Sequence, residues 1–194
     1  PDSSENEVTN IISHSESKVM FVSQRLAGRV SQEVKDKMVL IFDMDTLEII
    51  KADEDKFTCD GRTSVPTPDD IATIIYTSGT TGSAKGVVLS HRNLISCVHS
   101  CYDATSRNEK DRWLSILPMP HTFEMTIGML YPMYAGASVY YMSKPPVPSL
   151  LLKAMKEVRP TTILAVPLII EKIYKNSILP TIKKSPLRIK TRKD

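Results

Sequence analysis

Short apolar segments rich in branched side chains alternate with helical patterns along most of the sequence. Residues 38–42 (MVLIF) and 71–77 (IATIIYT) are continuous apolar runs of the kind that forms strands buried on both faces of a sheet. Between such runs, apolar residues recur at three- and four-residue intervals, as Leu94, Val98 and Cys101 do, which is typical of an amphipathic helix. Strands that alternate with helices favour an α/β fold, with a mostly parallel sheet and helices on both of its faces.

The same patterns place the remaining elements. Expected strands cover residues 18–22, 38–42, 71–77, 112–119, 137–142 and 161–167. Expected helices cover residues 6–15, 24–34, 123–134, 148–158 and 167–174, together with one that Ser90 would cap and that runs past Leu94 to Cys101. Residues 43–67 break the alternation, because they are charged and contain Gly61 and Pro66. We interpret this stretch as a long excursion or a seam between sub-domains.

Charge and cysteine content exclude several classes of protein. The 194 residues carry a formal net charge of +3 at pH 7, which is too weak for a nucleic-acid-binding protein with its concentrated basic face. The basic excess gathers at residues 183–193 and favours a solvated tail; the alternative is contact with an anionic cofactor or a membrane surface. Three cysteines cannot build a disulfide framework and suit a reducing compartment. Cys97 and Cys101 show no recognised metal-ligand spacing, so we expect them to pack in the core.

Targeting signals are not evident. No apolar run approaches the roughly 18 residues that a membrane-spanning helix needs, and the acidic start PDSSENEV does not resemble a secretory signal. We therefore expect a cytoplasmic protein, with peripheral membrane association as an alternative. The first residue is not Met, which indicates a piece of a longer protein.

The most distinctive motif is YTSGTTGSAKGV, residues 76–87, between an expected strand and an expected helix. Its glycines allow the backbone to approach a ligand closely, and successive N–H groups can form a nest for an anion. The position after a strand matches the place where open α/β sheets bind ligands. These features predict a polyphosphate site. Its binding groups would be the backbone at Gly79 and Gly82, the hydroxyls of Thr77, Ser78, Thr80 and Thr81, and the ammonium group of Lys85.

Two common phosphate loops do not fit this motif. A Walker A loop requires G-x-x-x-x-G-K-[ST], whereas here Ala84 precedes Lys85 and Gly86 follows it. The dinucleotide fingerprint G-x-G-x-x-G does not occur in the sequence. A flexible turn rich in Gly, Ser and Thr is the remaining alternative, but the order of the residues is too particular for it.

The longer stretch YTSGTTGSAKGVVLSHRNL closely resembles the phosphate-loop signature of the adenylate-forming superfamily. This superfamily includes acyl-CoA synthetases, luciferases and the adenylation domains of peptide synthetases. Its usual signature has Pro immediately before the Lys, where this chain has Ala84. The exchange leaves the phosphate-binding groups of the loop intact.

Further segments extend the resemblance over nearly the whole chain. Residues 117–141 resemble the next core segment of the superfamily, and the form HTFE, His121 to Glu124, is most like long-chain fatty acid–CoA ligases. Residues 159–175 are similar to the RPT…VPR…EKIY stretch of those enzymes, with Leu168 where many of them have Arg, and residues 14–22 are similar to the helix–strand unit before the loop. The resemblance implies part of the large N-terminal domain of an adenylate-forming enzyme.

The resemblance also implies chemistry. A carboxylate attacks the α-phosphate of ATP to give an acyl-adenylate and pyrophosphate, and the sulfur of coenzyme A then attacks the adenylate. Lys85 would neutralise the β- and γ-phosphates, Thr77 would lie near a Mg²⁺ ion, and His121 would orient the carboxylate or the adenylate at the acyl pocket. The cofactor-binding residues would be Thr77, Ser78, Gly79, Thr80, Thr81, Gly82, Lys85 and Glu124.

Other parts of the superfamily pattern are missing: the Tyr-Gly-x-Thr-Glu motif, the ribose-binding Asp segment and the small mobile C-terminal domain. We therefore expect an inactive fragment in two parts. Residues 1–67 would end a first α/β sub-domain that includes the excursion at 43–67, and residues 68–194 would form a phosphate-loop sub-domain that is cut short. Two alternatives stay open, namely adenylation of an aryl or amino acid, and a non-catalytic module that binds a nucleotide or a partner.

Overall fold

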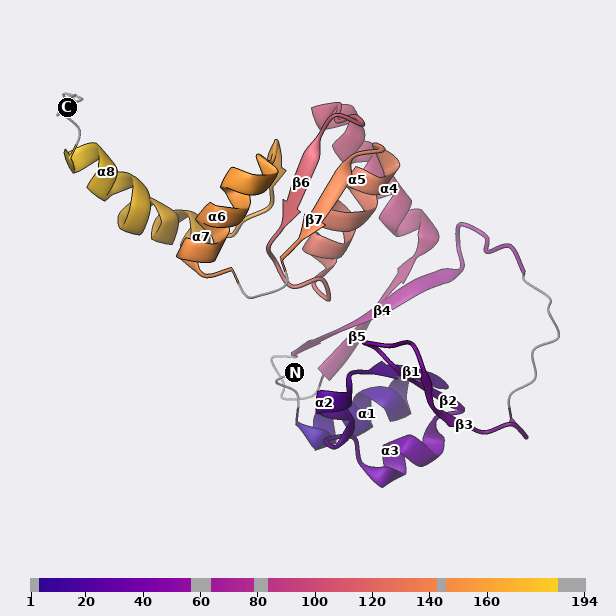
Figure 1. The fold of residues 1–194 in the computed structure, drawn as a ribbon. Coiled ribbons are helices and arrows are strands. Elements are labelled where there is room, and N and C mark those ends of the chain that lie inside the picture. The colour runs from indigo at the N-terminus through magenta and orange to yellow at the C-terminus, as the bar shows by residue number, and fades with distance from the viewer. Residues whose placement is uncertain (1–3, 57–63, 79–83, 143–145, 185–194) are drawn as a thin grey trace. The chain divides into compact units, whose positions relative to one another are not determined.

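The computed structural model describes residues 4–56, 64–78, 84–142 and 146–184 (Figure 1). The chain divides into two compact units, residues 1–91 and 92–194, and each is described here by itself. This division lies at His91, whereas the sequence pattern placed a sub-domain boundary after residue 67. The boundary at residue 67 stays a prediction.

The first unit contains a three-stranded sheet in the order β1–β2–β3. Strands β1 (Val19–Val22) and β2 (Leu40–Asp43) are parallel, and β3 (Ile49–Ala52) is antiparallel to β2. The sequence pattern did not indicate β3, which lies inside the expected excursion. A tight turn brings it back onto β2, because Asp43 Oδ1 accepts a hydrogen bond of 2.8 Å from the backbone N–H of Asp45.

The described part of the first unit has the helices α1 (Glu5–Ser15), α2 (Gln24–Ala27) and α3 (Gln32–Lys37), of which α1 and α3 pack on this sheet. The helix expected at 24–34 is instead two short helices, because α2 ends at Ala27, before Gly28, and the Ser31 side chain caps α3. Helix α1 begins with a capping box, in which Ser4 Oγ accepts from the N–H of Glu7 and the Glu7 carboxylate accepts from the N–H of Ser4. The core of the unit consists of Ile12, Val34, Met38 and Ile41.

The remaining strands of the first unit form an antiparallel hairpin, β4 (Ile71–Ser78) and β5 (Ala84–Ser90). The motif loop therefore joins two strands. The expectation of a loop between a strand and a helix was wrong, since α4 begins only at His91. Strand β4 is also not buried on both faces, because Ile71 is 61% exposed and Ile74 38%. The physical reason is that β4 pairs with no other described strand than β5.

The second unit contains a fully parallel sheet in the order β7–β6–β8. Its strands are β6 (Arg112–Ser115), β7 (Ser138–Tyr141) and β8 (Thr162–Ile163). The helical segments are α4 (His91–Thr105), the π-helix η1 (Glu124–Leu130), α5 (Tyr131–Tyr134), α6 (Pro148–Val158), α7 (Pro167–Ile173), the π-helix η2 (Tyr174–Ile178) and α8 (Leu179–Lys184).

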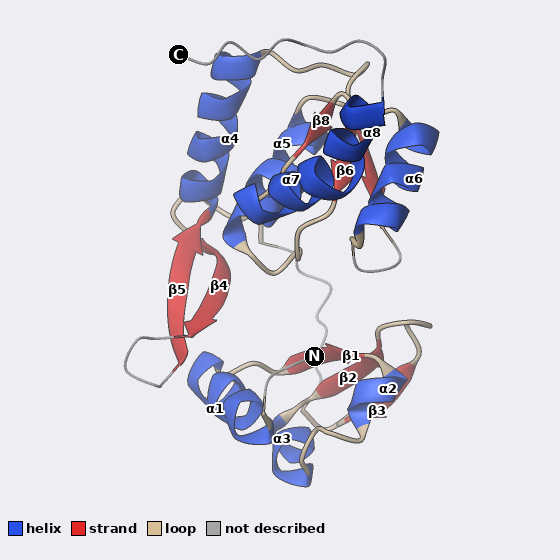
Figure 2. Cartoon of the chain, turned by 90° about the vertical axis from the view of Figure 1, so that its left-hand side faces the viewer, coloured by secondary structure: helices blue, strands red, loops and turns tan. Residues whose placement is uncertain are grey.

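Helices cover both faces of this sheet (Figure 2). Successive strand residues point to opposite faces, and in β6 Trp113 packs with Val98 of α4 and Tyr131 of α5. The next residue, Leu114, packs with Leu151 of α6. With β1–β2, β6–β7 and β6–β8 parallel, the predicted α/β fold with a mostly parallel sheet and helices on both faces is confirmed.

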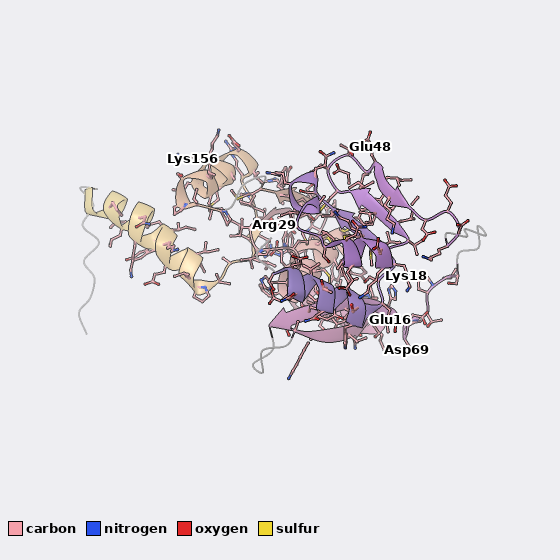
Figure 3. All side chains as sticks on the ribbon, turned by 90° about the horizontal axis from the view of Figure 1, so that it is seen from below. Glu16, Lys18, Arg29, Glu48, Asp69 and Lys156 are labelled. Atoms are coloured by element: carbon pink, nitrogen blue, oxygen red, sulfur yellow. The ribbon has the colours of Figure 1, made fainter. Side chains whose placement is uncertain are left out.

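The surface combines charged and apolar side chains. Glu16, Lys18, Glu48 and Lys156 are exposed, and Figure 3 labels them among the other side chains. Large apolar side chains are exposed as well, including Phe21 on strand β1. Within the described ranges, no helix has the length and apolar character needed to cross a membrane.

Candidate functional site

The ends of the phosphate-loop motif, on either side of the loop, lie in the paired strands β4 and β5. Thr77 pairs with Lys85 across the two strands, and Ser78 pairs with Ala84 at the end where the loop leaves. The side chains of Thr77 and Lys85 are both exposed. Four predicted loop residues, Gly79, Thr80, Thr81 and Gly82, lie outside the described residues. The hairpin therefore brings one hydroxyl and one ammonium group to the base of the predicted phosphate loop.

The face of the hairpin opposite to Thr77 and Lys85 carries the aromatic side chain of Tyr76. Tyr76 pairs with Gly86, and a Cβ atom added at Gly86 would lie 3.0 Å from Ile74 Cγ2 and 3.2 Å from Tyr76 Cζ. Gly86 thus gives the Tyr76 ring room to lie across the neighbouring strand. The Tyr76 hydroxyl lies 2.7 Å from Nδ1 of His14, in the last turn of α1. Neither His14 nor Tyr76 was among the residues predicted for the site.

His121 follows β6, the central strand of the parallel sheet. Its N–H donates to the carbonyl of Pro118 at 3.1 Å, and its own carbonyl accepts from the N–H of Met125 at 3.0 Å. These bonds hold the turn between β6 and η1. The His121 side chain is exposed beyond the carboxyl end of β6, where open α/β sheets bind ligands. The predicted role of His121 at the acyl group stays a prediction.

Glu124 has different surroundings from those of the other predicted residues. It is fully buried at the start of η1, and its Oε1 accepts a hydrogen bond of 2.5 Å from Ser115 Oγ at the end of β6. Within the described part of the chain, its Oε2 has no hydrogen-bond partner. Burial raises the pKa of the Glu124 carboxyl, and the hydrogen bond from Ser115 offsets only part of that rise. The predicted contact between Glu124 and a cofactor stays a prediction.

A glycine makes room for this carboxyl. A Cβ atom added at Gly128 would lie 2.6 Å from both the carboxyl carbon and Oε1 of Glu124. The Glu124 side chain thus folds back over the residue four positions later in η1. Our sequence analysis did not select Ser115 or Gly128. The available signal for Gly128 was an isolated glycine inside an apolar helical pattern, which often marks a packing requirement.

The predicted residues fall into two groups. Thr77, Ser78 and Lys85 belong to the first unit, whereas His121 and Glu124 belong to the second. Within the first group, Thr77 and Lys85 are cross-strand partners. Within the second, the turn at His121 leads directly into the helix that buries Glu124.

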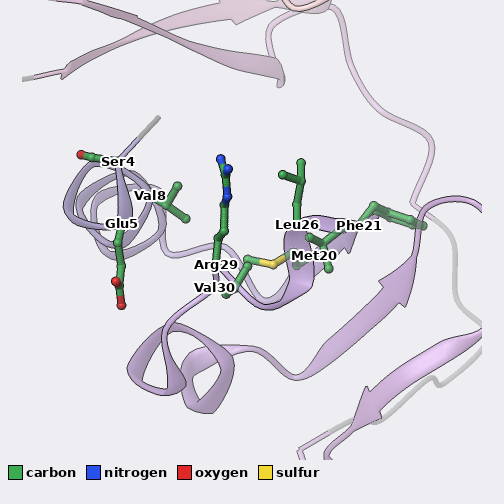
Figure 4. Close-up of a pocket in the computed structure, with 9 residues that line it drawn as sticks. Ser4, Glu5, Val8, Met20, Phe21, Leu26, Arg29 and Val30 are labelled. Carbon is green, nitrogen blue, oxygen red and sulfur yellow. The ribbon is translucent and has the colours of Figure 1, made fainter. Parts of the chain in front are cut away.

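One cavity of the described structure lies elsewhere in the first unit. It has a volume of about 530 Å³ and is lined by residues of α1, β1 and α2 with the turn that follows (Figure 4). Val8, Met20, Phe21 and Leu26 make its lining mostly apolar, and Arg29 reaches into it. None of the residues predicted for the phosphate site lines this cavity.

The described residues contain no group of three or more His, Cys, Asp or Glu side chains able to hold a metal ion. Mg²⁺ bound together with a nucleotide takes most of its ligands from phosphate oxygens and water, and needs only one or two from the protein. The exposed hydroxyl of Thr77 fits such a site. Mg²⁺ that arrives with a nucleotide would therefore need no cluster of protein ligands.

Comparison with known proteins gives one family match and several relatives. A family model described as "AMP-binding enzyme" matches residues 1–191. Fatty acyl-CoA synthetase B from Dictyostelium discoideum is 36% identical over 126 residues, which is 65% of this chain and 18% of that protein. The peroxisomal long chain acyl-CoA synthetase 6 from Arabidopsis thaliana is 38% identical over 109 residues, 56% of this chain and 15% of that protein.

Among solved structures, the N-terminal domain of FACL13 from Mycobacterium tuberculosis, determined with an inhibitor bound, is 25% identical with a TM-score of 0.74. The match covers 92% of this chain and 45% of that domain. The matches to the two curated relatives span less than a fifth of their length. The likeness therefore concerns one part of much longer proteins.

Proposed function

The chain belongs to the AMP-binding enzyme family, and from this membership we propose that it is part of a long-chain fatty acid–CoA ligase. The observation that carries the proposal is the exposed Thr77–Lys85 pair at the base of the signature loop. The relatives named as fatty acyl-CoA and long chain acyl-CoA synthetases support the choice of acid. The form HTFE at His121–Glu124 supports the same choice.

In the proposed reaction, an oxygen of the fatty acid carboxylate forms a bond to the α-phosphorus of ATP. The bond from that phosphorus to the bridging oxygen breaks, and pyrophosphate leaves with the electron pair. The thiolate of coenzyme A then attacks the acyl carbon, and AMP leaves with the electrons of the acyl–oxygen bond. Both steps bring anions together, so the protein contributes mainly by positioning groups and neutralising charge.

Lys85 and Thr77 would serve the first step. The Lys85 ammonium group would bind the β- and γ-phosphates and stabilise the charge that develops on the leaving pyrophosphate. The Thr77 hydroxyl, paired with Lys85 across the hairpin, would complete the ligands of Mg²⁺. Mg²⁺, when bound, supplies further neutralisation of phosphate charge. The amides and hydroxyls of Ser78 and residues 79–82 would bind the remaining phosphate oxygens.

His121 would act at the acyl end of the reaction. Its exposed imidazole can donate a hydrogen bond to a carboxylate or an adenylate oxygen and so fix the direction of attack. The turn bonds from His121 to Pro118 and Met125 support this orientation. Glu124, buried and bound to Ser115, would contribute by holding the helix after His121.

Calorimetry on the 194-residue chain tests the phosphate-binding part of the proposal. ATP with Mg²⁺ and inorganic tripolyphosphate are titrated separately, because the phosphate loop should bind tripolyphosphate without an adenine pocket. We expect Lys85→Ala to weaken both ligands by at least tenfold, whereas Lys18→Ala, which removes another exposed ammonium group of the first unit, leaves binding unchanged. Equal affinities for Lys85→Ala and the unaltered chain would exclude the role of Lys85.

The choice of acid needs a full-length enzyme that contains this sequence. Pyrophosphate release is measured with a panel of fatty, aryl and amino acids. Activity with long fatty acids is expected. Activity confined to aryl or amino acids would replace the fatty-acid proposal by the alternative adenylation reaction, and nucleotide binding without any pyrophosphate release would favour a non-catalytic module.

A further inference from the structure

Strand pairing within the described residues does not orient the hairpin that carries the phosphate-loop motif. Strands β4 and β5 pair with each other and with no other described strand. Backbone hydrogen bonds to a larger sheet therefore do not set its direction. Side-chain contacts must do so, and the bond of 2.7 Å between His14 Nδ1 and the Tyr76 hydroxyl is one that links the hairpin to helix α1.

We propose that His14 is a positioning residue for the Thr77–Lys85 pair of the hairpin, which it holds through Tyr76. The inference rests on the proposed function, because it assigns His14 a role in phosphate binding by that pair. The His14 and Tyr76 rings also meet edge to face, with centroids 5.8 Å apart and planes at 87°. Hydrogen bond and ring contact together fix both the distance and the direction of the Tyr76 side chain.

The two faces of the hairpin carry different side chains. Side chains alternate between the faces of a strand, so Tyr76 lies on the opposite face from Thr77. The same alternation places Lys85 on the opposite face from Gly86, over which the Tyr76 ring lies. The face that contacts His14 is therefore separate from the one that presents Thr77 and Lys85. Anchoring the first face leaves the second face accessible to phosphate.

Helix α1 is a firm support for this contact. Its first turn is closed by the Ser4–Glu7 capping box, and Ile12 lies in the core of the unit. Lys37 Nζ of α3 donates a hydrogen bond of 2.9 Å to Ser13 Oγ, next to His14. The last turn of α1 is thus tied both to the core and to a neighbouring helix. A residue that is held in this way can fix the position of a two-stranded hairpin.

The test is a double-mutant cycle on the 194-residue chain with inorganic tripolyphosphate as the probe. Tyr76→Phe keeps the ring and removes the hydroxyl, and His14→Ala removes the imidazole. We expect each variant to weaken tripolyphosphate binding about two- to tenfold, which is the range of one net hydrogen bond. The double variant should lose no more than the larger single loss, because both changes remove the same contact.

Two further variants separate positioning from general damage. In His14→Asn the amide group replaces Nδ1, so binding should return to within about twofold of the unaltered chain. In Ser31→Ala the side-chain cap of α3 is lost but the contacts of His14 and Tyr76 remain, so a loss of stability without a loss of affinity is expected. Failure of His14→Asn to restore binding, or additive losses in the double variant, would overturn the inference.

The outcome also distinguishes this inference from the proposed function. If Lys85→Ala leaves tripolyphosphate binding intact, the role of Lys85 in the proposed function is refuted. If Lys85→Ala abolishes binding while Tyr76→Phe and His14→Ala bind normally, the phosphate loop stands and only the positioning role fails. Tyr76→Phe is a mild change, and it keeps the test valid even if His14→Ala does not fold.

Discussion

Ser115 Oγ donates a hydrogen bond of 2.5 Å to Glu124 Oε1 and thereby joins the end of strand β6 to the start of the π-helix η1. Both residues are buried, and Glu124 has no exposed surface. A carboxyl group in such surroundings is more stable as the neutral acid, because charge is poorly solvated there. The Glu124 carboxyl thus links strand β6 to the helix that follows His121.

The first prediction concerns the pH dependence of stability. The pKa of Glu124 is raised in the folded chain above its ordinary value of 4.5, so the folded state binds more protons than the unfolded state between these two values. This contribution to stability is complete below pH 4.5 and is lost as the pH rises through the folded pKa. The side chain in Glu124→Gln cannot ionise, so the free energy of unfolding of this variant should not fall in this way as the pH rises.

The measurement is urea unfolding between pH 4.5 and 8, followed by the fluorescence of Trp113, the only tryptophan, which is buried in the second unit. Relative to the unaltered chain, Glu124→Gln should gain stability as the pH rises across this range, because its side chain stays neutral. The control is Glu157→Gln on the exposed face of α6. Parallel curves for the unaltered chain and Glu124→Gln would contradict the assignment.

A second prediction concerns Gly128. The added methyl group of Gly128→Ala would meet the Glu124 carboxyl at 2.6 Å, so we expect the free energy of unfolding to fall by about 1–3 kcal/mol. The double variant Gly128→Ala with Glu124→Ala should lose less free energy of unfolding than the sum of the two single losses, because Glu124→Ala removes the carboxyl that the added methyl group would meet. Gly28→Ala serves as the control, since nothing lies within 4 Å of its added Cβ. Additive losses would show that the two residues do not interact.

A third prediction concerns Asp111, which ties the start of β6 to the segment before β8. Its carboxylate accepts from Thr161 Oγ1 at 2.6 Å and from the N–H of Asn108 at 3.0 Å. The Thr161 bond, followed by the Asn108 bond, lowers the pKa of Asp111 below its ordinary value. The stabilisation is therefore present above the unfolded pKa and is lost as the pH falls through the folded pKa.

Replacing this carboxylate tests the linkage. Asp111→Asn should lower the free energy of unfolding by about 1–3 kcal/mol at pH 7 and should reduce the further loss in acid. Asp103→Asn, at an exposed position of α4, is the matched control. Trp113 fluorescence during urea unfolding measures the free energy of unfolding of both variants. An Asp111→Asn variant as stable as the control at pH 7 would exclude the network as a stabilising element.

A fourth prediction addresses helix α1. Ser4→Ala removes the side-chain acceptor of the capping box and should destabilise the first unit by about 1 kcal/mol. Asn10→Ala, exposed in the middle of the same helix, should be neutral or slightly stabilising because Ala is the better helix former. Far-UV circular dichroism during urea unfolding compares the two. Equal stability of both variants would argue against the cap.

Local patterns predicted some elements of the fold and missed others. Helix α6 has the predicted bounds, Pro148 to Val158, because proline suits the first turn and the apolar residues recur with helical spacing. Strand β8 is shorter than predicted and contains only Thr162 and Ile163. The hairpin was missed because residues 84–90, the seven residues of β5, were taken as part of the loop motif rather than as a strand of their own.

The sequence by itself determined the alternation of strands and helices and the identity of the phosphate-loop residues, because both depend on neighbours within a few positions. Only the tertiary structure decided what surrounds the key side chains. The Glu124 carboxyl is buried beside Ser115, and it fills the space that a side chain at position 128 would take. Tyr76 meets His14 from 62 positions away. Local periodicity contains no information about such partners, since folding brings them together through packing of the whole unit.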